Sequence, residues 1–250
     1  MRNDIAIQMY SIKDITKENY LTGFKLVSDL GFKNIELAGT YGLSDADFKA
    51  VCDEYGLKVI SAHIGGEDKT TEEIKDIIKY QTAIGNDMVI CPWSPCNDLE
   101  STKQIAKSLK RMQDIYESEG FKFGYHNHGF EFNKIDGDLR AIDIIAAEGV
   151  KLQPDIHWVK VGGAEPLDFM KQYKSQIISL HFKEYGINNT NPEFGNGGIL
   201  DWQAIMDFGK EIGVEYNILE QEEYSLPVAE SIALCAKNLE KCLNSLRRIL

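Results

Sequence analysis

One phrase recurs along the 250 residues of this chain: an amphipathic helical run, then a glycine, then a short apolar run. The glycines are Gly31, Gly56, Gly85, Gly120, Gly149 and Gly213. Each follows a helical pattern directly, at the position where many helices end in a residue of positive φ. The apolar runs after the glycines are typical of buried strands. Because a helix leads into a strand again and again, the chain is constrained to an alternating α/β fold.

The repeat predicts eight strands once the apolar runs near both ends are added. The expected strands are 5–11, 34–39, 58–64, 88–93, 122–128, 151–157, 177–183 and 216–222. The expected helices are 17–30, 44–55, 70–84, 99–119, 138–148, 165–175, 201–212 and 226–249. Alternation implies a parallel sheet, and eight units without a G-x-G-x-x-G loop after the first strand favour a closed barrel. We therefore predict an α/β protein with a single (β/α)8 TIM barrel domain over residues 1–250.

Composition and charge exclude several classes of protein. A hydrophobic fraction of 43% with 26% charged residues is typical of a soluble globular chain. The chain contains no run of 18 apolar residues, so no transmembrane helix is predicted. The net charge of −12 argues against a nucleic-acid partner. The first residues carry no secretory leader, so we expect a cytoplasmic protein, although a trimmed export signal would leave no trace. The five cysteines are scattered without a CxxC pair and are expected to be reduced.

Metal-ligating and acid–base side chains gather at the expected strand ends, which is where barrel enzymes carry their active sites. These residues are His63, His126, His128, Glu131, Asp155, His157, His181, Lys183, Glu220 and Glu222. All five histidines of the chain are among them, and none falls on an expected helix. A single histidine at a strand end, such as His128 or His157, is more often a hydrogen-bonded structural residue. The joint placement of imidazoles and carboxylates instead predicts a site for Mn²⁺, Zn²⁺, Fe²⁺ or Co²⁺ rather than Ca²⁺.

Strand parity indicates which of these side chains point into the barrel, because alternate residues of a strand share a face. His181 and Lys183 share one face of their strand, opposite Leu180 and Phe182. In the same way His126 is paired with His128, and Glu220 with Glu222. We therefore expect His181, Lys183 and Glu220 to point inward. Glu223 is expected to be a solvated loop charge, and we consider the same for Glu184.

Several segments together resemble the xylose-isomerase-like TIM barrel superfamily of sugar and sugar-phosphate isomerases and epimerases, inosose dehydratase and endonuclease IV. These segments are SAHIG, YHNHGFEF, QPDIHWVKVGGAEP, SLHFKEY, FGNGGILDW and ILEQEEY, in that order along most of the chain. The YHNH strand is similar to that of a subgroup of sugar isomerases and epimerases.

The resemblance implies one divalent metal ion, such as Mn, Zn, Mg or Co, held by Glu, Asp, His and Glu at the ends of strands five to eight. Asp155, His181 and Glu220 match the last three positions. The fifth strand departs from the pattern, because His126 stands where the glutamate is expected. Either His126 replaces that carboxylate as a ligand, or Glu131 reaches back to the site.

The resemblance also implies a mechanism in which two groups flank the substrate and move a proton beside a carbonyl through an enediolate. Glu220 is the candidate for one base, and the second role falls to Glu131, His126 or a water. Lys183 and His63 are candidates for holding substrate oxygens. Trp93 and Trp158 either stack on a sugar face or pack in the core.

Our first functional hypothesis is therefore a metal-dependent isomerase or epimerase acting on a sugar or keto-polyol. The alternatives are an inosose-dehydratase-like or keto-sugar lyase and a metal-free sugar-binding barrel. An endonuclease IV-like repair enzyme is disfavoured by the charge and by the few histidines. No arginine lies at an expected strand end, which favours a substrate without phosphate. The partners we expect are a small sugar or polyol, no nucleic acid and no membrane, and the oligomeric state is left open, a homo-oligomer included.

Overall fold

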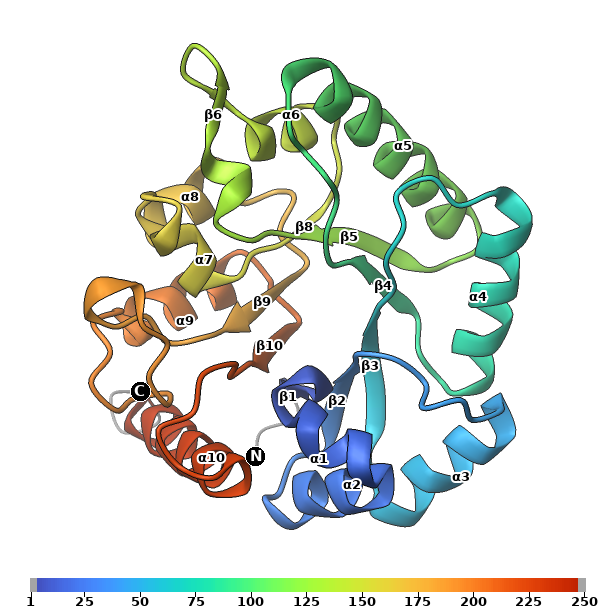
Figure 1. Ribbon diagram of the computed structural model, residues 1–250, viewed down its shortest axis with the longest axis vertical. Helices are drawn as coiled ribbons and strands as arrows, with labels where there is room; N and C mark the ends of the chain where they lie inside the picture. Colours follow the sequence, from blue (N-terminus) through green and yellow to red (C-terminus); the bar gives the residue numbers. More distant parts are fainter. Residues whose placement is uncertain (1–3, 247–250) are drawn as a thin grey trace.

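The computed structural model describes residues 4–246, which form one closed parallel barrel (Figure 1). Its strands are β1 (Ile5–Gln8), β2 (Asn34–Leu37), β3 (Lys58–His63), β4 (Met88–Cys91), β5 (Lys122–His126), β8 (Leu152–Gln153), β9 (Ser179–Phe182) and β10 (Tyr216–Leu219). They run side by side in the order β8-β5-β4-β3-β2-β1-β10-β9. Parallel bridges from Leu152 to Ile177 and from Asp155 to His181 join the segments of β8 and β9, the two strands at the ends of this order, and so close the barrel. The predicted (β/α)8 barrel is confirmed.

The helices lie around the outside of these strands (Figure 1). They are α1 (Lys13–Glu18), α2 (Tyr20–Asp29), α3 (Asp45–Tyr55), α4 (Thr71–Ala83), α5 (Leu99–Ser118), α6 (Ala141–Ala147), α7 (Ile156–Val161), α8 (Pro166–Gln172), α9 (Trp202–Glu211) and α10 (Val228–Leu246). The six glycines of the repeat have φ values from 63° at Gly56 to 89° at Gly149, as predicted. Within residues 4–246, no helix has the length and apolar character needed to cross a membrane.

Alternation along the strands separates an apolar layer from a polar interior. Leu180 and Phe182 of β9 pack in the apolar layer between the strands and the helices. His181 and Lys183 are also buried, but they contact carboxylates inside the barrel. Other strands also contribute buried polar side chains that bond to one another, among them Gln8, Glu36 and Gln153. The predicted faces of His181, Lys183 and Glu220 are confirmed.

The sixth expected strand is shorter than predicted, and helix α7 begins where the strand was expected to continue. Pro154 cannot donate to a sheet ladder, and Asp155 caps α7 by accepting a hydrogen bond from the backbone N–H of Trp158 at 2.9 Å. His157 therefore lies on a helix. The expectation that no histidine is helical is wrong for this residue.

Two expected helices also differ from the structure. The segment at 17–30 is interrupted at Asn19, whose side chain caps α2, so that α1 and α2 are separate helices. The segment at 138–148 begins with β7 (Leu139–Arg140), which forms a hairpin with the preceding β6 (Lys134–Asp136), and its helix starts only at Ala141. Gly137 turns this hairpin with a φ of 57°. Of the last expected helix, 247–249 lie outside the described residues.

Candidate active site

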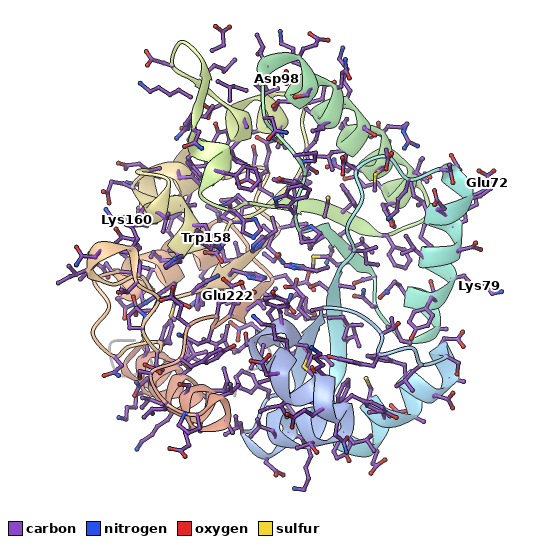
Figure 2. The ribbon with its side chains drawn as sticks, in the orientation of Figure 1. Glu72, Lys79, Asp98, Trp158, Lys160 and Glu222 are labelled. Atoms are coloured by element: carbon purple, nitrogen blue, oxygen red, sulfur yellow. The ribbon has the colours of Figure 1, made fainter. Side chains whose placement is uncertain are left out.

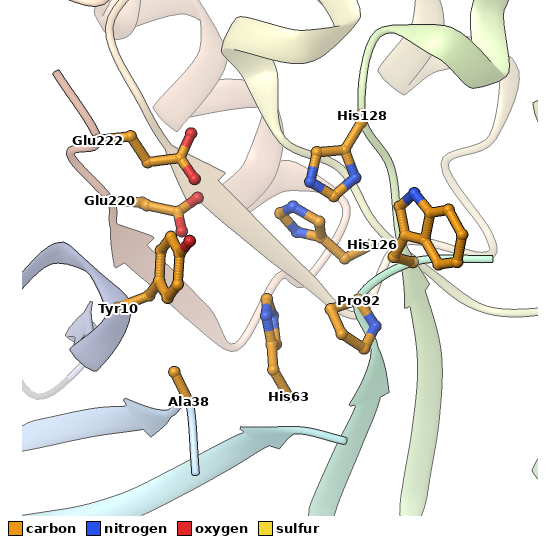
Figure 3. A pocket seen from close by; sticks show the side chains of 9 residues that line it. Tyr10, Ala38, His63, Pro92, His126, His128, Glu220 and Glu222 are labelled. Atoms are coloured by element: carbon orange, nitrogen blue, oxygen red, sulfur yellow. The ribbon is translucent and has the colours of Figure 1, made fainter. Parts of the chain in front are cut away.

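A cavity of about 350 Å³ opens among the segments that follow the carboxyl ends of β1 to β5 and β10 (Figure 3). Its lining residues are Tyr10, Ala38, His63, Pro92, Trp93, His126, His128, Glu220 and Glu222. Figure 3 shows Glu220 and Glu222 on one side of this space and His126 and His128 across from them. Figure 2 places Glu222 and Trp158 near the centre of the molecule, whereas Glu72 and Lys79 of α4 lie at its rim. The cavity therefore occupies the end of the barrel where catalytic sites are found in this architecture.

Four predicted metal ligands meet at this end of the barrel. His126, Asp155, His181 and Glu220 each offer one ligand atom, these atoms lie within 4.8 Å of one another, and all four residues are buried. They come from β5, from the segment after β8, from β9 and from the end of β10, which are successive around the barrel. A cluster of this composition can hold a divalent metal ion.

The bonding of Asp155 fits a cation in this cluster. Its Oδ1 accepts the capping hydrogen bond from the N–H of Trp158, and its own N–H donates to Oδ1 of Asn127 at 3.2 Å. Its Oδ2 is buried and has no hydrogen-bond partner within residues 4–246. A buried carboxylate oxygen without a donor costs about 1–3 kcal/mol or more. An ion held by Oδ2 would remove this cost.

Lys183 supplies positive charge beside the cluster but leaves an excess of carboxylates. Its Nζ contacts the Glu222 carboxylate and lies 3.7 Å from Oε2 of Glu220 and 3.9 Å from Oδ2 of Asp155. Burial opposes the charged form, yet the carboxylates, Glu220 first, raise the pKa of Lys183. One ammonium faces three carboxylates here, so there is negative charge left for a metal ion or a substrate proton.

His181 lies between two carboxylates. Its Nδ1 is 3.0 Å from Oε2 of Glu220, and its Nε2 is 2.6 Å from Oε1 of Glu36. Burial alone would lower the pKa of this imidazole, but the charges of Glu36 and Glu220 raise it to about 10. A metal ion at Nδ1 would therefore replace a proton.

Two further imidazoles, those of His126 and His128 at the end of β5, line the cavity and are neutral. Burial, with the neighbouring His181 and His63, lowers the pKa of His126 well below its usual value. Burial and the Lys183 ammonium lower the pKa of His128 to about 4. Each ring therefore keeps a lone pair at neutral pH, and Nδ1 of His128 is buried without a partner within the described part of the chain.

Glu131 points away from the cavity. Its two carboxylate oxygens accept hydrogen bonds from the hydroxyl of Tyr125 at 2.7 Å and from the backbone N–H of His128 at 2.8 Å. Tyr125 belongs to the apolar layer outside the barrel, on the opposite face of β5 from His126. The two residues that sequence reasoning left open are thus separated: the structure brings His126 into the cluster and leaves Glu131 behind the strand.

The remaining candidates fall into two groups. His63 lines the cavity, and Trp93 stands at its edge with 51% of its surface exposed. Trp158 lies on α7 with its ring 4.8 Å from Nζ of Lys183. His157 instead has Nδ1 at 2.7 Å from the backbone carbonyl of Glu184, which is a structural contact.

Sequence reasoning missed Glu36 and misjudged Glu184. Glu36 is fully buried in β2 and contacts two imidazoles of the site, those of His63 and His181. The signal was available, because Glu36 is a charged residue between Ile35 and Leu37 in an expected buried strand. Glu184 is not a solvated loop charge: it is buried and accepts a hydrogen bond from the indole N–H of Trp202 at 2.7 Å.

Comparison with known proteins agrees with this architecture. Residues 24–242 match the family of xylose isomerase-like TIM barrels. The chain belongs to this family. The matched segment contains all four cluster residues together with Glu36 and Lys183. No curated protein matches the sequence significantly.

Solved structures similar to this xylose isomerase-like barrel cover nearly its whole length. A sugar phosphate isomerase/epimerase from Parabacteroides distasonis is 22% identical with a TM-score of 0.82, covering 95% of this chain and 97% of its own. The 3-keto-D-glucoside 4-epimerase YcjR from E. coli is 16% identical with a TM-score of 0.72, covering 97% and 100%. A Mycobacterium smegmatis barrel in complex with magnesium is 16% identical with a TM-score of 0.72, covering 96% and 95%. At these identities the likeness shows the fold.

Proposed function

We propose that this protein is a metal-dependent isomerase or epimerase of a sugar or keto-polyol, which moves a proton on a carbon beside a carbonyl. The observation that carries the proposal is the buried cluster of His126, Asp155, His181 and Glu220 beside a sugar-sized cavity, with one carboxylate oxygen of Asp155 that has no donor among the described residues. The epimerase and isomerase names of similar structures support the same reaction class.

In this proposal His126, Asp155, His181 and Glu220 hold one divalent ion, whether Mn, Zn, Mg or Co. When bound, the ion stabilises negative charge that develops on a substrate oxygen during proton removal. The two imidazoles with two carboxylates suit Mn²⁺, Zn²⁺ or Co²⁺ better than Ca²⁺. Glu131 takes no part, because both of its oxygens already accept hydrogen bonds behind β5.

Glu220 is the base that we assign to the first proton transfer, because its carboxylate lies at the cluster and also lines the cavity. The carbon–hydrogen bond breaks, the proton goes to the carboxylate, and the electron pair moves toward the carbonyl oxygen. A proton then returns to the opposite face of that carbon or to its neighbour. Across the cavity, where Figure 3 shows His126 and His128, we assign this second step to a water held by the neutral His128: the water gives a proton to the carbon, and the hydroxide that remains takes the proton from Glu220.

An uncharged substrate fits the cavity better than a phosphorylated one. Its charged lining residues, Glu220 and Glu222, are both acidic, and the nearby Lys183 is already surrounded by carboxylates. Tyr10 and Trp93 are 42% and 51% exposed and line the same cavity, so an aromatic face is available on which a sugar ring can pack. His63, which lines the cavity, is the group that we assign to substrate hydroxyls, and we assign Lys183 to holding the carboxylates of Glu220 and Glu222.

The test is deuterium exchange in D₂O by the metal-loaded protein, with a panel of ketoses, keto-polyols, keto-glycosides and their phosphates. We expect wash-in of deuterium without loss of water or aglycone, a preference for uncharged substrates, and loss of exchange in Glu220→Gln. Glu131→Gln is the matched control and should keep exchange. Elimination products would establish the lyase alternative instead. If the protein takes up no divalent ion, the metal-free sugar-binding barrel would be the remaining alternative.

A further inference from the structure

A layer of buried polar side chains lies next to the four proposed metal ligands, and the proposed reaction uses none of these side chains. We call this layer the polar floor and define it by five residues with no exposed surface: Gln8, Glu36, Ser61, Gln153 and Ser179. They come from β1, β2, β3, β8 and β9, so the floor spans the barrel interior. A polar network of this size inside a barrel is costly unless every group is satisfied. Its hydrogen bonds therefore have defined directions.

The directions follow from Glu36, because an ionised carboxylate can only accept. It accepts from Nε2 of Gln8 at 2.8 Å, from the hydroxyl of Ser61, and from Nε2 of Gln153 at 2.7 Å. Nε2 of Gln153 also donates to the hydroxyl of Ser179 at 2.9 Å. With its nitrogen committed to these two acceptors, the amide of Gln153 turns its oxygen toward the opposite side.

That oxygen determines the protonation of two imidazoles. Oε1 of Gln153 lies 2.8 Å from Nε2 of His63 and 3.2 Å from Nδ1 of His126. Since an amide oxygen only accepts, both nitrogens must carry hydrogen. The same argument applies to Nε2 of His181, which lies 2.6 Å from Oε1 of Glu36. The ring nitrogens left for a metal ion are Nε2 of His126 and Nδ1 of His181.

We infer that Glu36 and Gln153 are positioning residues for the metal centre: Gln153 fixes the tautomer of His126, and Glu36 keeps the proton on Nε2 of His181, so that each ring presents one defined nitrogen to an ion, Nδ1 of His181 once its own proton is displaced. This inference rests on the proposed function, because it assigns the ion to the same four residues. It also explains how the histidine at the end of β5 can serve as a ligand with a defined nitrogen. The imidazole of His126 is oriented by Gln153, its register partner on β8.

The expected effect of breaking the floor is a weaker metal site with an intact fold. Outer-shell partners of metal-bound histidines are typically worth roughly 10- to 100-fold in metal affinity. Gln153→Met removes the acceptor from His126 at similar volume, and Glu36→Gln removes the charge opposite His181. Ser61→Ala is the matched control, because Ser61 donates to Glu36 without contacting an imidazole. We expect Zn²⁺ and Mn²⁺ dissociation constants to rise about 10- to 100-fold in the first two variants and by less than about threefold in the control.

A second readout needs neither metal nor activity. In ¹⁵N-labelled metal-free wild-type protein, long-range ¹H–¹⁵N spectra, assigned with His126→Gln, are expected to show His126 protonated at Nδ1 and bare at Nε2. In Gln153→Met this single tautomer is expected to become a mixture.

The two readouts separate the outcomes. If His126 is protonated at Nδ1 but the wild type binds no divalent ion, the orientation of His126 by the polar floor is upheld and the proposed metal-dependent function fails. If His126 carries its proton on Nε2, or if metal affinity in folded Gln153→Met and Glu36→Gln equals that of the Ser61→Ala control, the positioning role is overturned.

Discussion

Buried carboxylates occur in two regions of this barrel, and their surroundings differ. Outside the ring of strands, Glu131, Glu184 and Glu193 receive hydrogen bonds from neutral donors. Glu184 accepts from the indole N–H of Trp202 and from a backbone N–H at 3.1 Å, and Glu193 accepts from the hydroxyls of Ser225 and Ser231 at 2.7 and 2.6 Å. Each of these groups fastens a loop or a turn.

Inside the barrel, Asp155 and Glu220 are surrounded by an ammonium and by imidazoles, and Oδ2 of Asp155 has no hydrogen-bond donor within residues 4–246. The difference teaches that burial alone does not mark a functional carboxylate. Outer carboxylates are satisfied by donors that the fold supplies. Of the inner ones, Glu36 is likewise satisfied, whereas Asp155 and Glu220 are the two that we assign to an ion.

The largest expected effect comes from Asp155→Asn. Asparagine still caps α7, but it removes the anionic oxygen that we assign to the ion. A four-ligand zinc-type site is worth roughly 10–16 kcal/mol, so one ligand corresponds to on the order of 10²- to 10³-fold in affinity. Titration calorimetry with Zn²⁺ measures this. An affinity unchanged from the wild type would break the distinction between the two regions.

Glu131 tests the outer region through pH. Burial raises the pKa of this carboxyl from 4.5 to about 7, against the hydrogen bonds from Tyr125 and His128. The folded state therefore binds its proton more tightly than the unfolded state, and this stabilisation is complete below pH 4.5 and lost as the pH rises through 7. Relative to wild type, Glu131→Gln is expected to gain about 2–3 kcal/mol in free energy of unfolding between pH 5 and 8.

Urea unfolding of both proteins across this range measures the difference, and metal affinity should stay the same in the two. A difference in free energy of unfolding that stays constant across pH would mean that Glu131 is ionised throughout. A loss of metal affinity in Glu131→Gln would mean that Glu131 is part of the metal site.

Gly198→Ala tests how tightly an outer carboxylate is packed. A Cβ at Gly198 would lie 1.9 Å from Cδ of Glu184, whereas a Cβ at Gly65 would have no neighbour within 4 Å in the described part of the chain. Overpacking of this kind costs about 1–3 kcal/mol, so thermal unfolding should show a clear loss for Gly198→Ala and almost none for Gly65→Ala. Equal stability of the two variants would show that Glu184 moves aside freely.

The smallest effect is expected at the cavity rim. Trp93→Ala removes an exposed aromatic face and should raise KM for an uncharged substrate a few-fold, about 0.5–1.5 kcal/mol, without changing metal affinity. Steady-state kinetics beside calorimetry separate these two quantities. A weaker metal site in this variant would contradict the assignment of Trp93 to substrate alone.

The fold could be predicted from sequence because its signals are local: a glycine of positive φ after six of the expected helices and an apolar run after each of these glycines. The site was only partly predictable, because its contacts join distant segments. Glu36 and His181 are 145 positions apart, and the local sequence around either residue does not predict their contact. The choice between His126 and Glu131 depends on the 3₁₀ turn at Phe130–Phe132, which holds Glu131 behind β5. His157 was misplaced because the cap at Asp155 ends the strand early.

The most direct test of the central claim is anomalous diffraction from crystals soaked with Mn²⁺ or Zn²⁺, measured on both sides of the metal absorption edge. We expect a single peak bonded to Nε2 of His126, Oδ2 of Asp155, Nδ1 of His181 and the carboxylate of Glu220, with Glu131 still bound to Tyr125. A peak bonded to Glu131 instead of His126, or no peak at this cluster, would contradict the account.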